Sequence, residues 1–239
     1  MTAARFGLVT GSGKGLGRAI ALTLAELVSG VAVHYREDRS AAEATAGMIR
    51  AKGKKSAVLR ADLTKEHEAE GLVARVERKF GRLDILVNNV GPLLVKPWAD
   101  LGAADWEKIF RANLIGPFVC LKAAMPGMRK RGWGRVINIG YSRAEQLAAF
   151  PTITAYAAAK TGLLILTRTA AVSEAGSGVT VNMVSPGLME GGIMPKAHGL
   201  PAAAVGTFAD VAGAVRYLVS EEARAVTGTN LVVAGTWKM

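Results

Sequence analysis

Short apolar runs and longer amphipathic segments alternate along this chain. The short runs are rich in valine, isoleucine and leucine, and in the longer segments the apolar residues recur at helical spacing. The pattern predicts strands over residues 6–11, 31–35, 55–62, 83–89, 134–140, 179–187 and 229–235. It predicts helices over residues 16–29, 40–53, 66–81, 105–130 and 209–221, and a further helix that begins near residue 154.

The strands are apolar along almost their whole length, which is typical of a parallel sheet covered by helices on both faces. The chain has 239 residues and shows no composition break and no internal repeat. We therefore predict an α/β fold: one Rossmann-type doubly wound domain over residues 1–239, with a parallel sheet of about seven strands. In such a sheet, ligands bind beyond the carboxyl ends of the strands.

The composition bears on cysteine chemistry, secretion, membrane insertion and metal binding. The one cysteine, Cys120, lies in an apolar run with no histidine near it, so we expect a buried hydrophobic residue and not a reactive thiol. No signal peptide is visible, and no apolar run reaches the roughly 18 residues that a membrane span requires. We expect a cytoplasmic protein that does not enter a membrane, and the sequence suggests no metal site.

The formal net charge is +11, which favours anionic partners such as phosphorylated cofactors or acidic proteins. The basic residues are scattered, and the densest run is Arg129–Arg131. No aromatic residues are interleaved with the basic ones, and no helix-turn-helix or zinc-finger pattern occurs. The charge alone therefore does not support nucleic-acid binding.

A glycine-rich loop, "TGSGKGLG" over residues 10–17, follows the first predicted strand and opens the first predicted helix. Glycine there permits a positive φ and close backbone approach, and the free N–H groups of the following helix attract a phosphate. This placement makes the motif a strong signal for a dinucleotide. The loop residues expected to contact the cofactor are Gly11, Ser12, Lys14, Gly15, Leu16 and Gly17.

The end of the second predicted strand bears on the choice of cofactor. An enzyme that prefers NAD commonly has an acid here to hold the ribose hydroxyls, but this chain has Tyr35 and Arg36. Arg36 and Lys14 could bind a 2′-phosphate, although both could equally be solvated surface charges. Glu37 and Asp38 follow closely and weigh against this. We expect NADP(H) to be preferred over NAD(H).

Tyr156 and Lys160 stand one turn apart in the alanine-rich segment "AYAAAKTG". The simple interpretation is a lysine that extends to solvent beside a half-buried tyrosine. The alternative is a proton-transfer pair, because a nearby cation stabilises a phenolate and lowers the phenol's pKa.

Seven motifs occur in one order along nearly the whole chain: "TGSGKGLG", "ADLT", "NNVG", "RANLIG", "VINIGYS", "YAAAK" and "VTVNMVSPG". In this order and spacing they resemble the short-chain dehydrogenase/reductase superfamily, and within it the 3-oxoacyl-[acyl-carrier-protein] reductases. The resemblance implies a seven-stranded parallel sheet and assembly into homotetramers or dimers.

The resemblance also implies roles for individual residues. Tyr156 would be the general acid/base, Lys160 its partner and a ligand of the nicotinamide ribose, and Asn113 the anchor of a proton-relay water. Three further groups match family cofactor contacts: Asp62 and Leu63 beside the adenine, Asn88, Asn89 and Gly91 of the "NNAG" motif, and Pro186 and Gly187 beside the nicotinamide. Taken alone, Asn88 and Asn89 could be turn residues, and Asn113 a surface amide of a helix.

This chain departs from the family pattern at three places. A serine that hydrogen-bonds the substrate carbonyl usually follows the fifth strand; here Tyr141 aligns with it and Ser142 comes next. We favour Ser142 for this role and leave Tyr141 open. The substrate lid, around residues 188–207, is short, and Gly191 lies where the family often has threonine. The arginine that many ketoacyl reductases carry before the sixth strand is Ser177 here.

The resemblance thus implies an NADPH-dependent enzyme that reduces a carbonyl to a secondary alcohol, with 3-oxoacyl thioesters as the expected substrate class. The acyl chain would be carried on acyl carrier protein or CoA, and Arg129–Arg131 would offer a basic surface to an acidic carrier. The displaced serine and short lid support the alternative of a catalytically weak, cofactor-binding or regulatory protein.

Overall fold

The computed structural model describes residues 4–192 and 205–235. Its centre is a seven-stranded sheet in the order β3-β2-β1-β4-β5-β6-β7, and all neighbouring strands are parallel. The strands are β1 (Phe6–Val9), β2 (Gly30–Tyr35), β3 (Lys55–Arg60), β4 (Ile85–Asn88), β5 (Gly134–Ile139), β6 (Val179–Pro186) and β7 (Asn230–Val233). The predicted fold class is confirmed.

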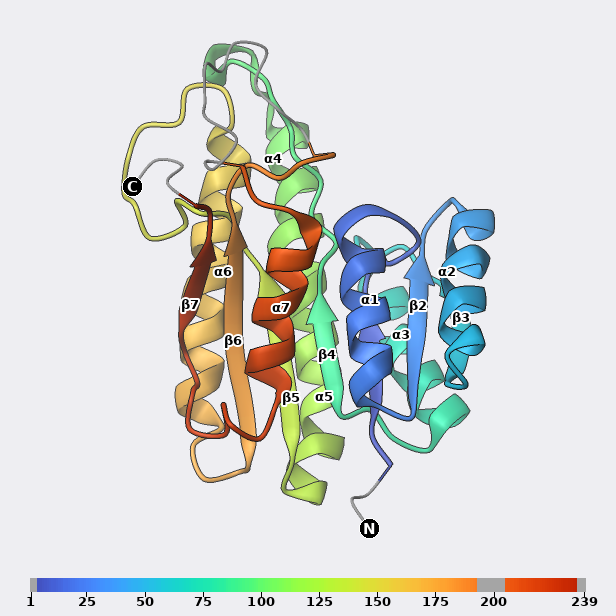
Figure 1. Cartoon of the computed structure of the whole chain (residues 1–239). Coiled ribbons are helices and arrows are strands. Elements are labelled where there is room, and N and C mark those ends of the chain that lie inside the picture. The colour runs from blue at the N-terminus through green and yellow to red at the C-terminus, as the bar shows by residue number, and fades with distance from the viewer. Residues whose placement is uncertain (1–3, 193–204, 236–239) are drawn as a thin grey trace.

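Helices cover both faces of the sheet (Figure 1). One layer contains α1 (Gly15–Leu27), α2 (Arg39–Ala51) and α7 (Phe208–Val219). The other contains α3 (Glu66–Phe80), α5 (Gly116–Arg131) and α6 (Thr154–Ser173). A short 3-10 helix, η1 (Trp98–Asp100), and α4 (Ala103–Phe110) follow β4.

Each helical layer buries its own apolar core against the sheet. Ile20, Leu24 and Val215 belong to the core on the α1 side, and Leu72 and Met128 to the core on the α3 side. Because the central strands contribute side chains to both cores, they must be apolar at nearly every position, which explains the continuous apolar runs in the sequence.

The predicted long helix over residues 105–130 is wrong in one respect. Helix α4 ends at Phe110, a π-helical turn η2 (Arg111–Ile115) follows, and α5 then begins at Gly116. Such turns commonly lie at functional sites, and this one carries Asn113. Apolar periodicity does not reveal it, because the turn depends on contacts with other parts of the chain.

Three further features concern the cysteine, the length of the helices and the acidic, histidine and cysteine side chains. Cys120 is buried, and burial raises the pKa of its thiol to about 12, so it is not an activated nucleophile. No described helix is long and apolar enough to cross a membrane. Within residues 4–192 and 205–235, no group of three His, Cys, Asp or Glu side chains is placed to hold a metal ion.

Candidate active site

The glycine loop lies at the carboxyl end of β1, next to the point where the strand order reverses between β1 and β4. Gly11 and Gly15 have φ of 62° and 55°, the left-handed region that favours glycine. A Cβ at Gly17 would lie 2.3 Å from the Gly11 carbonyl oxygen, so only glycine lets the start of α1 approach the loop this closely.

Neighbouring side chains hold the loop in shape. Asn89 follows β4, and its amide donates to the carbonyls of Thr10 (2.9 Å) and Gly11 (3.2 Å). The Ser12 hydroxyl is buried and donates to the Val9 carbonyl at 2.8 Å. The side chain of Ser12, expected to contact a cofactor, is thus used to fold the loop.

His34, on β2, also holds the glycine loop, and the sequence patterns gave no sign of this role. Its Nδ1 accepts from the Gly11 N–H at 2.9 Å, and its Nε2 lies 3.0 Å from the Ala61 carbonyl. A backbone N–H must meet an unprotonated nitrogen, so Nε2 carries the proton and donates to Ala61. Burial lowers the pKa of His34 to about 4, which keeps the ring neutral.

A cavity of about 440 Å³ opens between this loop and the ends of β2, β3 and β4. Of the residues expected to bind a cofactor, it is lined by Gly11, Lys14, Tyr35, Arg36, Asp62, Leu63, Asn89 and Gly91. His34 and Thr64 also line it. Together with the tightly packed glycine turn at Gly11 and Gly17, this shape fits the adenosine half of a dinucleotide, with its phosphates near the start of α1.

The charges beside this cavity are mixed. Arg36 pairs with Glu37 at 2.7 Å, and Lys14 lies 3.9 Å from Asp38. The cations expected to meet a 2′-phosphate therefore already have carboxylate partners. Both pairs are largely exposed, where such contacts contribute little and rearrange readily.

Hydrogen bonds within its own turn determine the charge state of the Asp62 carboxyl. Burial alone would raise the pKa of its carboxyl, but hydrogen bonds from the Thr64 hydroxyl (2.8 Å) and backbone N–H (3.0 Å) outweigh this and lower the pKa. The carboxylate therefore stays ionised at the edge of the cavity.

Lys160 projects from α6 into the protein interior and is 2% exposed. Its Nζ donates to the carbonyl of Ile139, at the end of β5, at 2.7 Å. The same atom lies 5.7 Å from the ring centroid of Tyr156, one turn earlier on the helix. The burial of Lys160 contradicts the simple interpretation, in which its side chain extends to solvent.

Gly91 brings Asn113 and Lys160 to one place. A Cβ at Gly91 would lie 2.7 Å from Asn113 Oδ1 and 2.7 Å from Lys160 Nζ. The Asn113 amide nitrogen donates to the carbonyls of Pro92 and Ile109, both at 3.1 Å, whereas its Oδ1 is buried without a described partner. A buried acceptor beside an ammonium is suited to a bridging water.

The expected effect of Lys160 on the Tyr156 pKa is not what this structure shows. Burial is the main influence on both groups: it raises the pKa of Tyr156 and lowers the pKa of Lys160 to about 7. A fully charged lysine would lower the pKa of the phenol, but removing an ammonium from water disfavours its charged form.

The segment after β5 is tied to the end of β6. The Ser142 N–H donates to the Pro186 carbonyl at 2.9 Å, and no described hydrogen bond joins the Ser142 hydroxyl to Tyr156. The Tyr141 ring instead packs edge-on against Tyr156, with centroids 5.6 Å apart. Gly187 is held close to β7, since a Cβ there would lie 2.6 Å from the Cβ of Ala234.

The two ends of the segment expected to form the lid meet beside the glycine loop. Met189 and Gly206 form an isolated bridge, and the Glu190 N–H donates to the Gly206 carbonyl at 2.8 Å. The Phe208 ring lies near both Gly15 and Gly191. The part of the expected lid between residues 193 and 204 lies outside the described residues.

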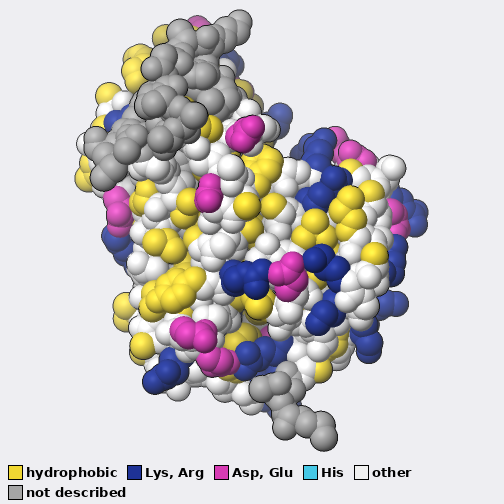
Figure 2. All heavy atoms as spheres, in the orientation of Figure 1, with side chains coloured by type: hydrophobic (Ala, Val, Ile, Leu, Met, Phe, Trp, Pro, Cys, Tyr) yellow, Lys and Arg dark blue, Asp and Glu magenta, His cyan; other side chains and the backbone are white. Residues whose placement is uncertain are grey.

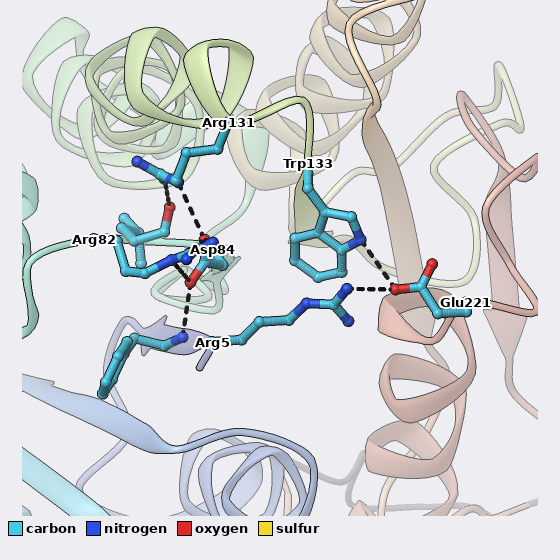
Figure 3. Close-up of polar contacts among 8 residues, drawn as sticks. Arg5, Arg82, Asp84, Arg131, Trp133 and Glu221 are labelled. Carbon is cyan, nitrogen blue, oxygen red and sulfur yellow. Dashed lines mark hydrogen bonds and ion pairs between the residues drawn. The ribbon is translucent and has the colours of Figure 1, made fainter. Parts of the chain in front are cut away.

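The basic run Arg129–Arg131 lies away from this site. Arg131 pairs with Asp84, just before β4, with 3.3 Å between Nε and Oδ1, while Arg129 Nε is 2.8 Å from Glu174 Oε2 (Figure 3 shows the first pair). These contacts lie toward the amino ends of the strands, opposite the cavity. On the face in Figure 2, basic and acidic side chains are interspersed and do not form one basic stripe.

The fold and site define a nicotinamide-dinucleotide-binding protein with a tyrosine–lysine–asparagine group beside the expected cofactor position. Comparison with known proteins supports this class. A family model described as enoyl-(acyl carrier protein) reductase matches residues 11–236. The chain belongs to the short-chain dehydrogenase/reductase family, whose members use a nicotinamide cofactor, and it is an oxidoreductase of that family.

Two curated relatives match almost end to end. The chain is 35% identical to D-beta-hydroxybutyrate dehydrogenase of Rhizobium meliloti, covering 96% of this chain and 97% of that protein. It is 34% identical to the 3-oxoacyl-[acyl-carrier-protein] reductase FabG of Staphylococcus aureus, covering 95% and 96%.

Two solved structures are similar to this one over almost the whole chain. Acetoin dehydrogenase from Enterobacter cloacae has a TM-score of 0.89 at 30% identity, covering 98% of this chain and 96% of that one. A blue fluorescent protein from a metagenomic library, solved with NADPH, has a TM-score of 0.89 at 32% identity and covers 98% of both chains.

Proposed function

We propose that this protein is an NADPH-dependent reductase that converts a ketone to a secondary alcohol. The observation that carries the proposal is the grouping of Asn113 Oδ1 and Lys160 Nζ around Gly91, with Tyr156 one helical turn from Lys160. Three segments distant in sequence supply these groups to one point: η2, the segment after β4, and α6.

The chain's own residues would perform the proton chemistry. A bound reduced nicotinamide supplies the hydride, and the nascent alkoxide needs a proton. Tyr156 is the donor that the site offers, because burial keeps its phenol protonated and its ring lies 5.7 Å from Lys160 Nζ. Lys160, with a pKa near 7, can hold or release a proton at neutral pH. Asn113 Oδ1 would anchor a water through which Tyr156 regains its proton.

Support for NADPH over NADH comes from Arg36 and Lys14, the cations beside the adenosine cavity. Their ion pairs with Glu37 and Asp38 are exposed and can open to a 2′-phosphate at little cost. One structural neighbour was solved in complex with NADPH. The test is the ratio of kcat/KM for NADPH and NADH, and Arg36→Glu should shift that ratio toward NADH.

The proposed substrates are 3-oxoacyl thioesters and similar ketones. The relatives' names point to a 3-oxoacyl chain, a hydroxybutyrate and acetoin. Arg129–Arg131 does not support docking of an acyl carrier protein, because Arg129 and Arg131 have acid partners and lie at the opposite edge of the sheet. CoA thioesters and acyl carrier protein thioesters of the same acyl chain are therefore compared directly.

The decisive experiment follows NADPH absorbance with a panel of 3-oxoacyl thioesters and ketones. Tyr156→Phe should lose nearly all turnover while still binding NADPH, because only the proton donor is removed. Full turnover by Tyr156→Phe, or failure of the native protein to bind NADPH, contradicts the proposal. NADPH binding with no turnover on the whole panel would instead support a regulatory cofactor-binding protein.

We also infer that the protein forms a homodimer or homotetramer. Leu147, Ile165 and Val172 are 94%, 63% and 78% exposed, which is unusual for large apolar side chains on or beside one helix, α6. A second copy of the chain would cover them. Sedimentation velocity tests this, and Ile165→Glu should shift the assembly toward monomer, whereas an unchanged assembly would show that this face is not the interface.

A further inference from the structure

Tyr141 lies two residues after the end of β5, at the carboxyl end of the sheet. Its ring lies between two others and meets both edge-on, with centroids 5.6 Å from Tyr156 and 5.9 Å from Phe150. It also packs against the small apolar cluster that contains Ala144 and Leu163. The ring therefore forms a wall directly beside the tyrosine of the candidate site.

The hydroxyl of Tyr141 is buried and has no hydrogen-bond partner among the described residues. Leaving a buried hydroxyl unpaired costs about 1–3 kcal/mol, and phenylalanine would fill the same space without this cost. Packing therefore explains the ring but not the hydroxyl. An unpaired donor next to the reacting groups is suited to a partner that arrives with the substrate.

The backbone holds Tyr141 firmly on both sides. The Gly140 N–H donates to the Val184 carbonyl at 2.8 Å, and the Ser142 N–H donates to the Pro186 carbonyl at 2.9 Å. Gly140 must be glycine, since a Cβ there would lie 2.4 Å from Ser185 Oγ. With β6 fixing the residues before and after it, the phenol is preorganised, as a group that binds a transition state should be.

We propose that Tyr141, in place of Ser142, supplies the second hydroxyl that binds the substrate's carbonyl oxygen beside Tyr156. The inference rests on the proposed reductase function. Tyr141 donates a hydrogen bond and keeps its proton, while Tyr156 transfers its own. Burial raises the pKa of Tyr141 to about 12, which is consistent with a donor that stays protonated. A phenol also reaches further than a serine, so the carbonyl would sit further from the β5 backbone.

The test compares Tyr141→Phe with Ser142→Ala as its matched control, in full-length protein, with the best ketone from the substrate panel. Tyr141→Phe should lower kcat by about 100-fold, the effect of removing one preorganised donor to a developing oxyanion. Its thermal midpoint should stay equal or rise, because an unpaired buried hydroxyl is gone. Ser142→Ala should keep kcat within about twofold, and both variants should bind NADPH as the native protein does.

Each alternative result decides the question. Full activity of Tyr141→Phe overturns the inference, as does a large loss confined to Ser142→Ala. A lower thermal midpoint for Tyr141→Phe would show that the hydroxyl has a structural partner, and that also overturns it. If Tyr156→Phe is inactive while Tyr141→Phe is fully active, only the inference fails. A native protein inactive on the whole panel overturns the inference together with the proposed function.

Discussion

His34 should make the protein sensitive to mild acid. The ring is 2% exposed and binds the glycine loop through an unprotonated Nδ1. Its ordinary pKa is 6.5, but burial lowers the pKa to about 4 in the folded protein. Below pH 6.5 the unfolded chain therefore binds a proton that the folded chain refuses, and the free energy of unfolding falls as the pH drops.

The two pKa values set the size of this effect. Each pH unit between them corresponds to about 1.4 kcal/mol, so the interval from 6.5 to about 4 corresponds to a total of about 3 kcal/mol. At about pH 5, roughly 2 kcal/mol of this is already lost. The loss is large compared with the 5–15 kcal/mol that typically stabilises a domain.

The measurement is urea unfolding at about pH 7 and about pH 5, at equal ionic strength, for the native protein and His34→Gln. Glutamine can accept and donate hydrogen bonds but does not titrate. It should lower stability at pH 7 and remove the additional loss of about 2 kcal/mol at pH 5. The other two histidines occur in both proteins, so their contributions cancel. Equal acid losses in the two proteins would refute the reasoning.

Two further substitutions separate the cofactor cradle from the structural core. Gly17→Ala places a Cβ 2.3 Å from the Gly11 carbonyl oxygen, so it should destabilise the fold by about 1–3 kcal/mol and sharply weaken NADPH binding. An unchanged NADPH affinity in calorimetric titration would contradict this. Asn138→Ala removes the side chain that hydrogen-bonds Asn88 Nδ2 (2.9 Å) and Thr167 Oγ1 (2.9 Å). It should lower the free energy of unfolding in urea by about 2–3 kcal/mol, while the NADPH affinity of the folded protein stays the same.

The contrast between Asn88 and Asn89 shows where motif matching stops being informative. Both belong to one motif, yet Asn89 braces the glycine loop and lines the cavity, whereas Asn88 is buried against Asn138 and α5. The period of a strand places successive side chains on opposite faces, so two adjacent asparagines must have different neighbours. Which of them faces the cavity depends on the sheet.

Periodicity was also insufficient for the segment that carries Asn113. A helix over residues 105–130 satisfies the apolar pattern, but the π turn of η2 lies within it. Two sets of contacts accompany the turn. Gly116 packs so closely against Leu63 that a Cβ at Gly116 would lie 2.6 Å from the Leu63 carbonyl oxygen. The Asn113 amide donates hydrogen bonds to the carbonyls of Pro92 and Ile109. The contacts with Leu63 and Pro92 join residues far apart in the chain, which a local pattern cannot encode.

The sequence by itself determined the sheet of alternating strands and helices, the glycine loop and the tyrosine–lysine pair, because spacing along one strand, loop or helix sets each of these. Tertiary structure alone decided which charged and polar groups are free to act. It buried Lys160, placed Arg129–Arg131 at the edge away from the cavity, and left the Tyr141 hydroxyl without a partner among the described residues. Solvation and partners control a group's charge and availability, and both come from segments distant in the sequence.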